Sequence, residues 1–152
     1  MPTYDSAKLN AELSRDEGRR AKPYKDSLGI LTVGIGHNLE AGPLPNQRYP
    51  MSDRQIDALF AKDVASTVKK LDVYLPWWRG LSDARQRVLI NMCFNLGIGR
   101  PGSGHGLLSF GGFLNLVHVG NYPAAADDML HTLWAKQVGK RATRLSQMMR
   151  AG

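Results

Sequence analysis

Apolar positions recur at helical spacing near the start of the chain. Leu9 and Leu13 lie four residues apart, and one more step of four reaches Glu17. Because residues four apart share one face of a helix, the spacing predicts a helix over 5–17, which Gly18 ends. The Glu17 carboxyl group is therefore expected on an apolar face at the helix end. Apolar surroundings disfavour ionisation of a carboxyl group, and a general acid must keep its proton near neutral pH.

An alternating pattern over 24–36 predicts a hairpin that follows this helix. Its turn is expected at 27–29, directly after Asp26, and its return strand at 30–36. Successive side chains of a strand point to opposite faces, so Thr32 is predicted to point away from the core face. The apolar residues predicted to share that core face are Leu31, Val33 and Ile35.

Helical periodicity returns after a proline-rich loop. Ser52 and Gln55 have the spacing of a capping box, and Met51 and Ile56 have that of a hydrophobic staple. Together they predict the start of a long helix over about 53–75.

The remainder of the chain is predicted to be helical around an apolar centre. A helix is expected after Ser82, and its second half, VLINMCFNL, has the composition of a buried helix. The glycine-rich loop 98–108 is interpreted either as a flexible gate or as tolerated surface variation. Further helices are expected at about 110–119, 122–135 and 140–150.

These elements predict an α+β, mainly helical protein with a single domain over 1–152. A small N-terminal lobe of about 15–55 is expected to hold a short antiparallel sheet. A linking helix of about 53–75 would join it to a larger helical lobe of about 76–152, to which the N-terminal helix is also assigned.

Composition and charge narrow the partners. The net charge of +7 predicts attraction to polyanions such as nucleic acid, anionic lipid, lipopolysaccharide or an acidic cell wall. Cys93 is the single cysteine and lies in an apolar run, so it is expected to be a buried thiol with no disulfide partner. The four histidines lack metal-ligand spacing, and no metal or other cofactor is expected.

The C-terminal segment is basic, and two interpretations of it stay open. It is either a solvated helix face or an amphipathic surface that engages anionic lipid or lipopolysaccharide. Its basic residues are Lys136, Lys140, Arg141, Arg144 and Arg150. Nucleic-acid binding is not expected, because no readout motif accompanies the charge. The glycines at 97–102 match a dinucleotide fingerprint by letter only, since a helix rather than a strand precedes them.

The candidate chemistry lies in the segment EGRRAKPYKDSLGILT. Glu17, Asp26 and Thr32 fall on a helix end, a turn and a strand, from which their side chains can converge. Two carboxyl groups and a water-holding hydroxyl are the equipment for breaking a glycosidic bond.

On these residues the chain resembles the phage-type lysozymes of glycoside hydrolase family twenty-four, the endolysins that cut bacterial cell walls. The motifs that carry the resemblance are DEG at 16–18, YKDSLGILTVGIGH at 24–37, RQRVLINMCFNLG at 85–97 and WAKQVGKRATR at 134–144. The resemblance implies a lysozyme-like fold. It also implies inverting cleavage of the β-1,4 bond between N-acetylmuramic acid and N-acetylglucosamine in peptidoglycan.

By this resemblance Glu17 is the general acid, Asp26 orients or activates the attacking water, and Thr32 holds the same water. An inverting enzyme would hold the two carboxyl groups about 6.5–9.5 Å apart. Arg141 matches a family arginine beside the catalytic glutamate. His37 and Asp63 match a family ion pair with a structural role.

Positions that match the family's substrate-binding residues are Phe94, Asn95, Asn38, Phe113 and Asp128. Phe94 is retained, and Asn95 beside it is a candidate sugar contact. Asn38, Phe113 and Asp128 stand where the family has leucine, serine and asparagine, so the sugar contacts are expected to differ from the family's.

The leading prediction is a monomeric muramidase that acts during phage lysis. The N-terminus lacks a signal-sequence pattern and no window is apolar enough to span a membrane, so the chain is expected in the host cytoplasm. It would reach the periplasmic wall through a separate pore, a holin. Membrane or lipopolysaccharide disruption is a second hypothesis. A wall-binding module without activity is a third.

Overall fold

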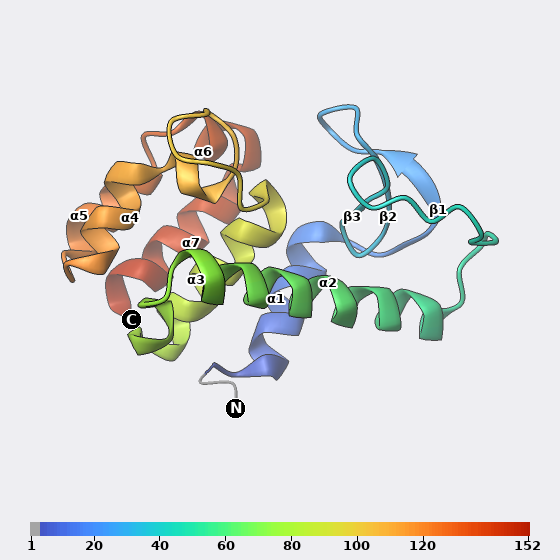
Figure 1. The fold of residues 1–152 in the computed structure, drawn as a ribbon, viewed down its shortest axis with the longest axis horizontal. Helices are drawn as coiled ribbons and strands as arrows, with labels where there is room; N and C mark the ends of the chain where they lie inside the picture. Colours follow the sequence, from blue (N-terminus) through green and yellow to red (C-terminus); the bar gives the residue numbers. More distant parts are fainter. Residues whose placement is uncertain (1–3) are drawn as a thin grey trace. The chain divides into compact units, whose positions relative to one another are not determined.

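The structure is a computed structural model that describes residues 4–152. The elements run in the order α1 (Ser6–Glu17), β1 (Arg20–Lys25), β2 (Leu31–Gly34), β3 (His37–Asn38), α2 (Asp53–Tyr74), the 3-10 turn η1 (Trp78–Gly80), α3 (Asp83–Leu96), the 3-10 turn η2 (Leu107–Ser109), α4 (Gly111–His118), α5 (Tyr122–Met129), α6 (Leu133–Val138) and α7 (Lys140–Ala151). This is the mainly helical α+β fold that the sequence predicts (Figure 1).

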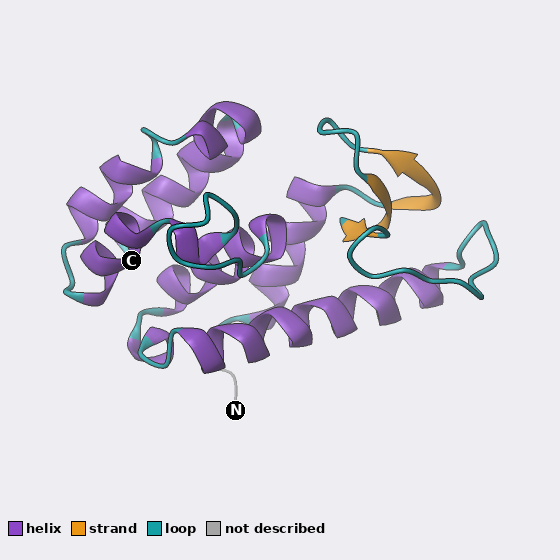
Figure 2. Cartoon of the chain, turned by 45° about the horizontal axis from the view of Figure 1, so that its top comes forward, coloured by secondary structure: helices purple, strands orange, loops and turns teal. Residues whose placement is uncertain are grey.

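The described chain divides into two compact units. The smaller unit takes in Ala7–Ser66, and the larger takes in Thr67–Gly152 together with residues 4–6. The strands, orange in Figure 2, all belong to the smaller unit. The α1 residues from Ala7 onward group with them.

The sheet is antiparallel with strand order β1-β2-β3. Its strands differ from the sequence prediction in length and number. The first strand begins at Arg20 rather than Tyr24, and the return strand ends at Gly34 rather than Gly36. The short strand β3 was not predicted. The return strand ends early because Gly34 and Gly36 both have φ of 65°, which is outside the range of an extended strand.

The two faces of the return strand also differ from the alternation expected. Val33 and Ile35 are buried, as predicted, but Leu31 is 39% exposed. Thr32 is only 5% exposed. Leu31 is exposed because it is the first residue of the short strand β2. Thr32, the next residue, is covered by its neighbours on the two adjacent strands. In this hairpin, the burial of a residue depends more on its position along the strand than on the face of the sheet to which its side chain points.

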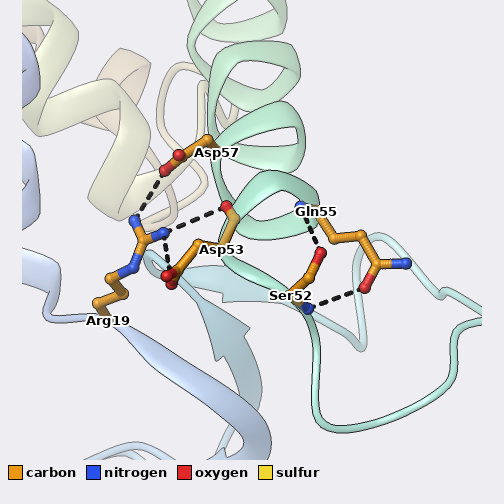
Figure 3. A network of polar contacts seen from close by, with 5 residues as sticks. All are labelled: Arg19, Ser52, Asp53, Gln55 and Asp57. Carbon is orange, nitrogen blue, oxygen red and sulfur yellow. Dashed lines mark hydrogen bonds and ion pairs between the residues drawn. The ribbon is translucent and has the colours of Figure 1, made fainter.

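Helix α2 begins as predicted, with a reciprocal capping box (Figure 3). The Gln55 amide N–H donates to the Ser52 hydroxyl at 3.1 Å, and the Ser52 amide N–H donates to the Gln55 side chain at 2.9 Å. Figure 3 also shows Arg19, which donates to the Asp53 and Asp57 carboxylates at 3.1 and 2.8 Å. These bonds tie the chain just after α1 to the first turns of α2.

The larger unit is a group of helices in which α7 packs against α3, α5 and α6, and α4 packs against α5 (Figure 1). Its core is apolar. Fully buried side chains include Trp78, Leu89, Ile90, Met92 and Met149. The run 88–96 of α3, predicted to be buried, is buried through Cys93, whereas its last three residues, 94–96, are partly or fully exposed.

The single helix predicted over 122–135 is wrong, because the structure has two helices there. Helix α5 ends at Met129 and α6 begins at Leu133. The Thr132 hydroxyl accepts a hydrogen bond from the Ala135 amide at 3.0 Å and so caps the second helix. A threonine three residues before a free amide is a start signal that continuous apolar spacing conceals.

The glycine-rich loop 98–108 is internally hydrogen bonded. The Leu107 and Leu108 amides donate to the Gly97 and Ile98 carbonyls, both at 2.9 Å. Gly99 and Gly106 lie back to back, since a Cβ atom on Gly106 would come within 2.4 Å of the Gly99 Cα. The loop is thus a narrow hairpin with an exposed tip.

Candidate active site

Glu17 is the last residue of α1 and is half-buried. The two leucines that precede it at steps of four are buried, so its predicted apolar face is confirmed. Gly18 then has φ of 74°, and its amide donates to the Ser14 carbonyl at 3.0 Å. This glycine ends the helix at the carboxyl-bearing residue.

Asp26 directly follows β1 and holds the turn of the hairpin. Its Oδ1 accepts hydrogen bonds from the Leu28 and Ile30 amides, both at 2.9 Å. Among the described residues, no protein donor bonds its other oxygen, Oδ2. One oxygen is therefore used to fix the carboxylate, and the second is left for a ligand or water.

Thr32 is held by the same backbone residue as Asp26. The Thr32 hydroxyl donates to the Ile30 carbonyl at 2.9 Å, and the Asp26 amide donates to that carbonyl at 2.9 Å as well. Ile30 thus binds Asp26 through its N–H and its C=O, and Thr32 through its C=O. Because the hydroxyl proton is used, the Thr32 oxygen can act toward a further partner as an acceptor.

Tyr24 is a neighbour of these groups that the sequence analysis missed. It is the cross-strand partner of Thr32. Partial burial raises the pKa of its phenol, the charges of Glu17 and Asp26 raise it further, and Arg20 opposes them. The Arg20 guanidinium lies 4.6 Å from the centre of the Tyr24 ring. Its position two residues before Asp26 was the available signal, because alternate residues of an extended chain point to the same side.

His37 and Asp63 form the contact that the resemblance implies. The His37 Nδ1 lies 2.7 Å from an Asp63 carboxylate oxygen, and Nε2 lies 2.7 Å from the Gly42 carbonyl. Both ring nitrogens are engaged, so this histidine fixes β3 to α2 and to the following loop. A structural role fits this geometry.

Three predicted residues lie in the larger unit near α3. Arg141 is buried, and its Nε donates to the Asn91 side chain at 2.9 Å. Asn95 is exposed and accepts a hydrogen bond from the Trp134 indole at 2.8 Å. Phe94 beside it is partly exposed. The expected place of Arg141 beside Glu17 stays a prediction.

The other predicted sugar contacts have varied surroundings. The Asn38 side chain accepts hydrogen bonds from the Glu40 and Ala41 amides at 2.8 and 3.0 Å, so it shapes the turn after β3. Phe113 is 1% exposed, and that burial favours a packing role. Asp128 is exposed on α5. Their binding of sugar stays a prediction.

The described residues contain neither a candidate metal cluster nor a helix that could span a membrane. No group of three or more histidine, cysteine, aspartate or glutamate side chains in 4–152 could hold a metal ion. No helix within the same range is long and apolar enough to cross a bilayer.

Comparison with known proteins identifies a family. Residues 14–150 match the phage lysozyme family. The chain is 25% identical over 162 residues to a probable T4-type lysozyme of Dictyostelium discoideum, covering 92% of each chain. It is 28% identical over 137 residues to the endolysin of Salmonella phage P22, covering 84% of this chain and 80% of the endolysin.

A longer relative aligns as well. The pre-baseplate central spike protein Gp5 of Enterobacteria phage T4 is 28% identical over 175 residues, and the alignment covers all of this chain. This chain spans 29% of the length of that relative. The family match covers most of the chain and includes the segment that carries Glu17, Asp26 and Thr32. The chain therefore belongs to the phage lysozyme family and is a lysozyme-type enzyme.

Proposed function

We propose that the chain hydrolyses the β-1,4 bond between N-acetylmuramic acid and N-acetylglucosamine in peptidoglycan, with inversion at the anomeric carbon. Glu17 acts as the general acid that protonates the departing glycosidic oxygen. Asp26 acts as the base, and Thr32 holds the attacking water beside it. Asp26 also stabilises the positive charge that develops on the sugar.

The observation that carries this proposal is the pair of acceptors that Ile30 holds together. Asp26 Oδ2 and the Thr32 oxygen can each accept a hydrogen bond from a water, and both residues are hydrogen bonded to the backbone of Ile30. A water that donates one proton to each acceptor directs a lone pair away from both. That lone pair is the nucleophile, and Asp26 receives the proton as the water attacks.

Glu17 supplies the complementary half of the reaction. Its position after buried Leu9 and Leu13 at the end of α1 gives it an apolar side and an accessible side. A protonated carboxyl group there donates its proton to the leaving oxygen as the bond breaks. Acid and base are then separate groups, as inversion requires.

The test uses purified Gram-negative peptidoglycan and the variants Glu17→Gln and Asp26→Asn. Loss of a general acid or base costs about 10²–10⁴-fold, so each variant is expected to lose at least about 10²-fold in clearing rate. Proton NMR of the first product then reports the anomer, and the α-anomer is expected for inversion of a β-bond. Wild-type rates in Glu17→Gln would overturn the proposal.

Membrane disruption by the basic C-terminal segment is a second candidate with less support. Arg141 is buried, and Arg150 is paired with the Asp127 carboxylate. Lys136 and Lys140 are exposed. Killing of intact cells that persists in Glu17→Gln would favour this function. Under the leading proposal the enzyme acts as a monomer and reaches the wall from the host cytoplasm through a holin.

A further inference from the structure

Gly36 makes a close approach to the Glu17 side chain. A Cβ atom built on Gly36 would lie 2.5 Å from Glu17 Oε2, 2.8 Å from Cδ and 2.9 Å from Cγ. Non-bonded carbon atoms pack at about 3.5–4.0 Å, so a side chain at position 36 and the observed Glu17 conformation exclude each other. The carboxyl group of Glu17 occupies the space that any other residue at position 36 would fill.

The collision is with side-chain atoms of Glu17 and not with backbone. Rotation of the Glu17 side chain would relieve it without moving α1 or the strands, and both residues lie in the smaller unit. Apart from the strain of its positive φ, position 36 can therefore accommodate a Cβ atom, whereas the observed carboxyl position of Glu17 cannot. This separates an effect on chemistry from an effect on folding.

We propose that Gly36 is a positioning residue for Glu17: its bare backbone is the surface against which the general acid is held. The proposal rests on the proposed function, because it takes Glu17 as the acid. A glutamate has several side-chain rotamers, and a wall on one side removes those that turn toward it. The remaining conformations present the carboxyl group toward the substrate.

Gly34 provides a matched control two residues away. Its φ is also 65°, so alanine meets the same unfavourable backbone conformation at either position. A Cβ atom on Gly34 would contact the Ile56 and Leu59 side chains at 3.7 and 3.8 Å, which is ordinary packing distance. Gly34→Ala thus reproduces the backbone strain of Gly36→Ala without touching Glu17.

The experiment compares kcat, KM and Tm of Gly36→Ala and Gly34→Ala on soluble peptidoglycan fragments. A displacement of about 1 Å of a catalytic group can cost about 10²-fold, so kcat of Gly36→Ala is expected to fall about 10²-fold below that of Gly34→Ala. KM and Tm are expected to agree between the two variants. Equal kcat values, or a loss confined to KM, would overturn the positioning role.

Glu17→Asp tests the cause of the loss. The shorter side chain retracts the carboxyl group from position 36, so Gly36→Ala is expected to cost less than about five-fold in the Glu17→Asp background. An undiminished loss of about 10²-fold in that background would contradict the contact. If Gly36→Ala has a lower Tm than Gly34→Ala, the double variant Glu17→Ala/Gly36→Ala decides. Removing the Glu17 side chain removes the collision, so the Tm of the double variant must rise to that of Gly34→Ala.

Glu17→Gln separates failure of this inference from failure of the proposed function. If Glu17→Gln is inactive while Gly36→Ala and Gly34→Ala have equal kcat, only the role of Gly36 is wrong. If Glu17→Gln retains wild-type kcat, Glu17 is not the acid, and both proposals are wrong.

Discussion

Ile30 contributes to the site through its backbone, and this decides which single residues can vary. Its amide and carbonyl groups hold Asp26, and its carbonyl also accepts the Thr32 hydroxyl. Backbone atoms are the same in every residue except proline. Apolar replacements of Ile30 should therefore keep the water-holding geometry, while replacement of Asp26 or Thr32 should not.

Thr32→Val tests the acceptor role of the hydroxyl. Valine keeps the shape of this buried side chain but removes the oxygen, and the Ile30 carbonyl still accepts the Asp26 amide. Loss of one hydrogen bond of about 1–3 kcal/mol to the water predicts a fall in kcat of roughly 10–10²-fold. Steady-state kinetics measure it, with Thr32→Ser as the active control. Full activity of Thr32→Val would contradict the water-holding role.

Cys93 should make the protein sensitive to alkali. Burial raises the pKa of its thiol from 9.0 to about 11. Between these values the unfolded chain loses the proton while the folded protein keeps it, so stability falls as pH rises from 9 to 11. The loss is expected to reach about 3 kcal/mol, since two pKa units correspond to about that free energy. Urea unfolding across this range measures the slope.

Cys93→Ala is the control, because it lacks the titrating group. Its cavity lowers stability equally at every pH, so only the difference in slope between the variant and the wild type is informative. Parallel curves from pH 9 to 11 would show that the thiol is not the cause.

Among the elements, helix α2 has its start defined by polar contacts of different kinds. The capping box satisfies backbone amides that the helix cannot, whereas Arg19 makes exposed ion pairs with Asp53 and Asp57. Capping residues contribute more than surface ion pairs of this type. The ion pairs tie the residue before β1 to the start of α2, whereas the capping box is local to the helix.

Ser52→Ala is expected to lower the free energy of unfolding by about 1 kcal/mol, because the first turn of α2 loses its cap. Arg19→Gln is expected to lower it by less than about 1 kcal/mol, since its partners are solvent-exposed. Chemical denaturation of both variants measures the order. A larger loss for Arg19→Gln would mean that the ion pairs, and not the cap, fix this helix start.

Elements with strong local signals were predictable from sequence, and elements defined by neighbours were not. The Leu9–Leu13–Glu17 spacing and the capping box of α2 are local, and the structure confirms both. The break between α5 and α6 has a local start signal, the Thr132 cap, that continuous apolar spacing conceals, and the short strand β3 depends on its pairing with β2. The closeness of Gly36 to Glu17 is of the same kind, because no spacing in the sequence brings those two residues together.

At the scale of the whole molecule, the net charge of +7 acts over longer distances than any single ion pair. It attracts polyanions at long range, and salt screens that attraction over about 10 Å at 0.1 M ionic strength. Positive charge therefore raises the concentration of the protein at the surface of an anionic polymer.

Clearing of intact peptidoglycan is accordingly expected to slow roughly several-fold between low and high ionic strength. The effect should appear in KM and leave kcat nearly constant, because screening weakens attraction and not the chemistry. Turbidity assays at graded salt measure it, and uncharged oligosaccharide fragments are the control. A salt effect of equal size on those fragments would contradict the electrostatic origin.

The hairpin at 98–108 has a consequence for protein engineering. Its two arms are joined at the base by the bonds of Leu107 and Leu108, and the glycine pair Gly99 and Gly106 keeps the arms in contact. The tip at 101–104 is exposed beyond these bonds. A foreign peptide spliced between Gly102 and Ser103 would leave the bonded base intact, which makes this tip a grafting point for a wall-targeting sequence.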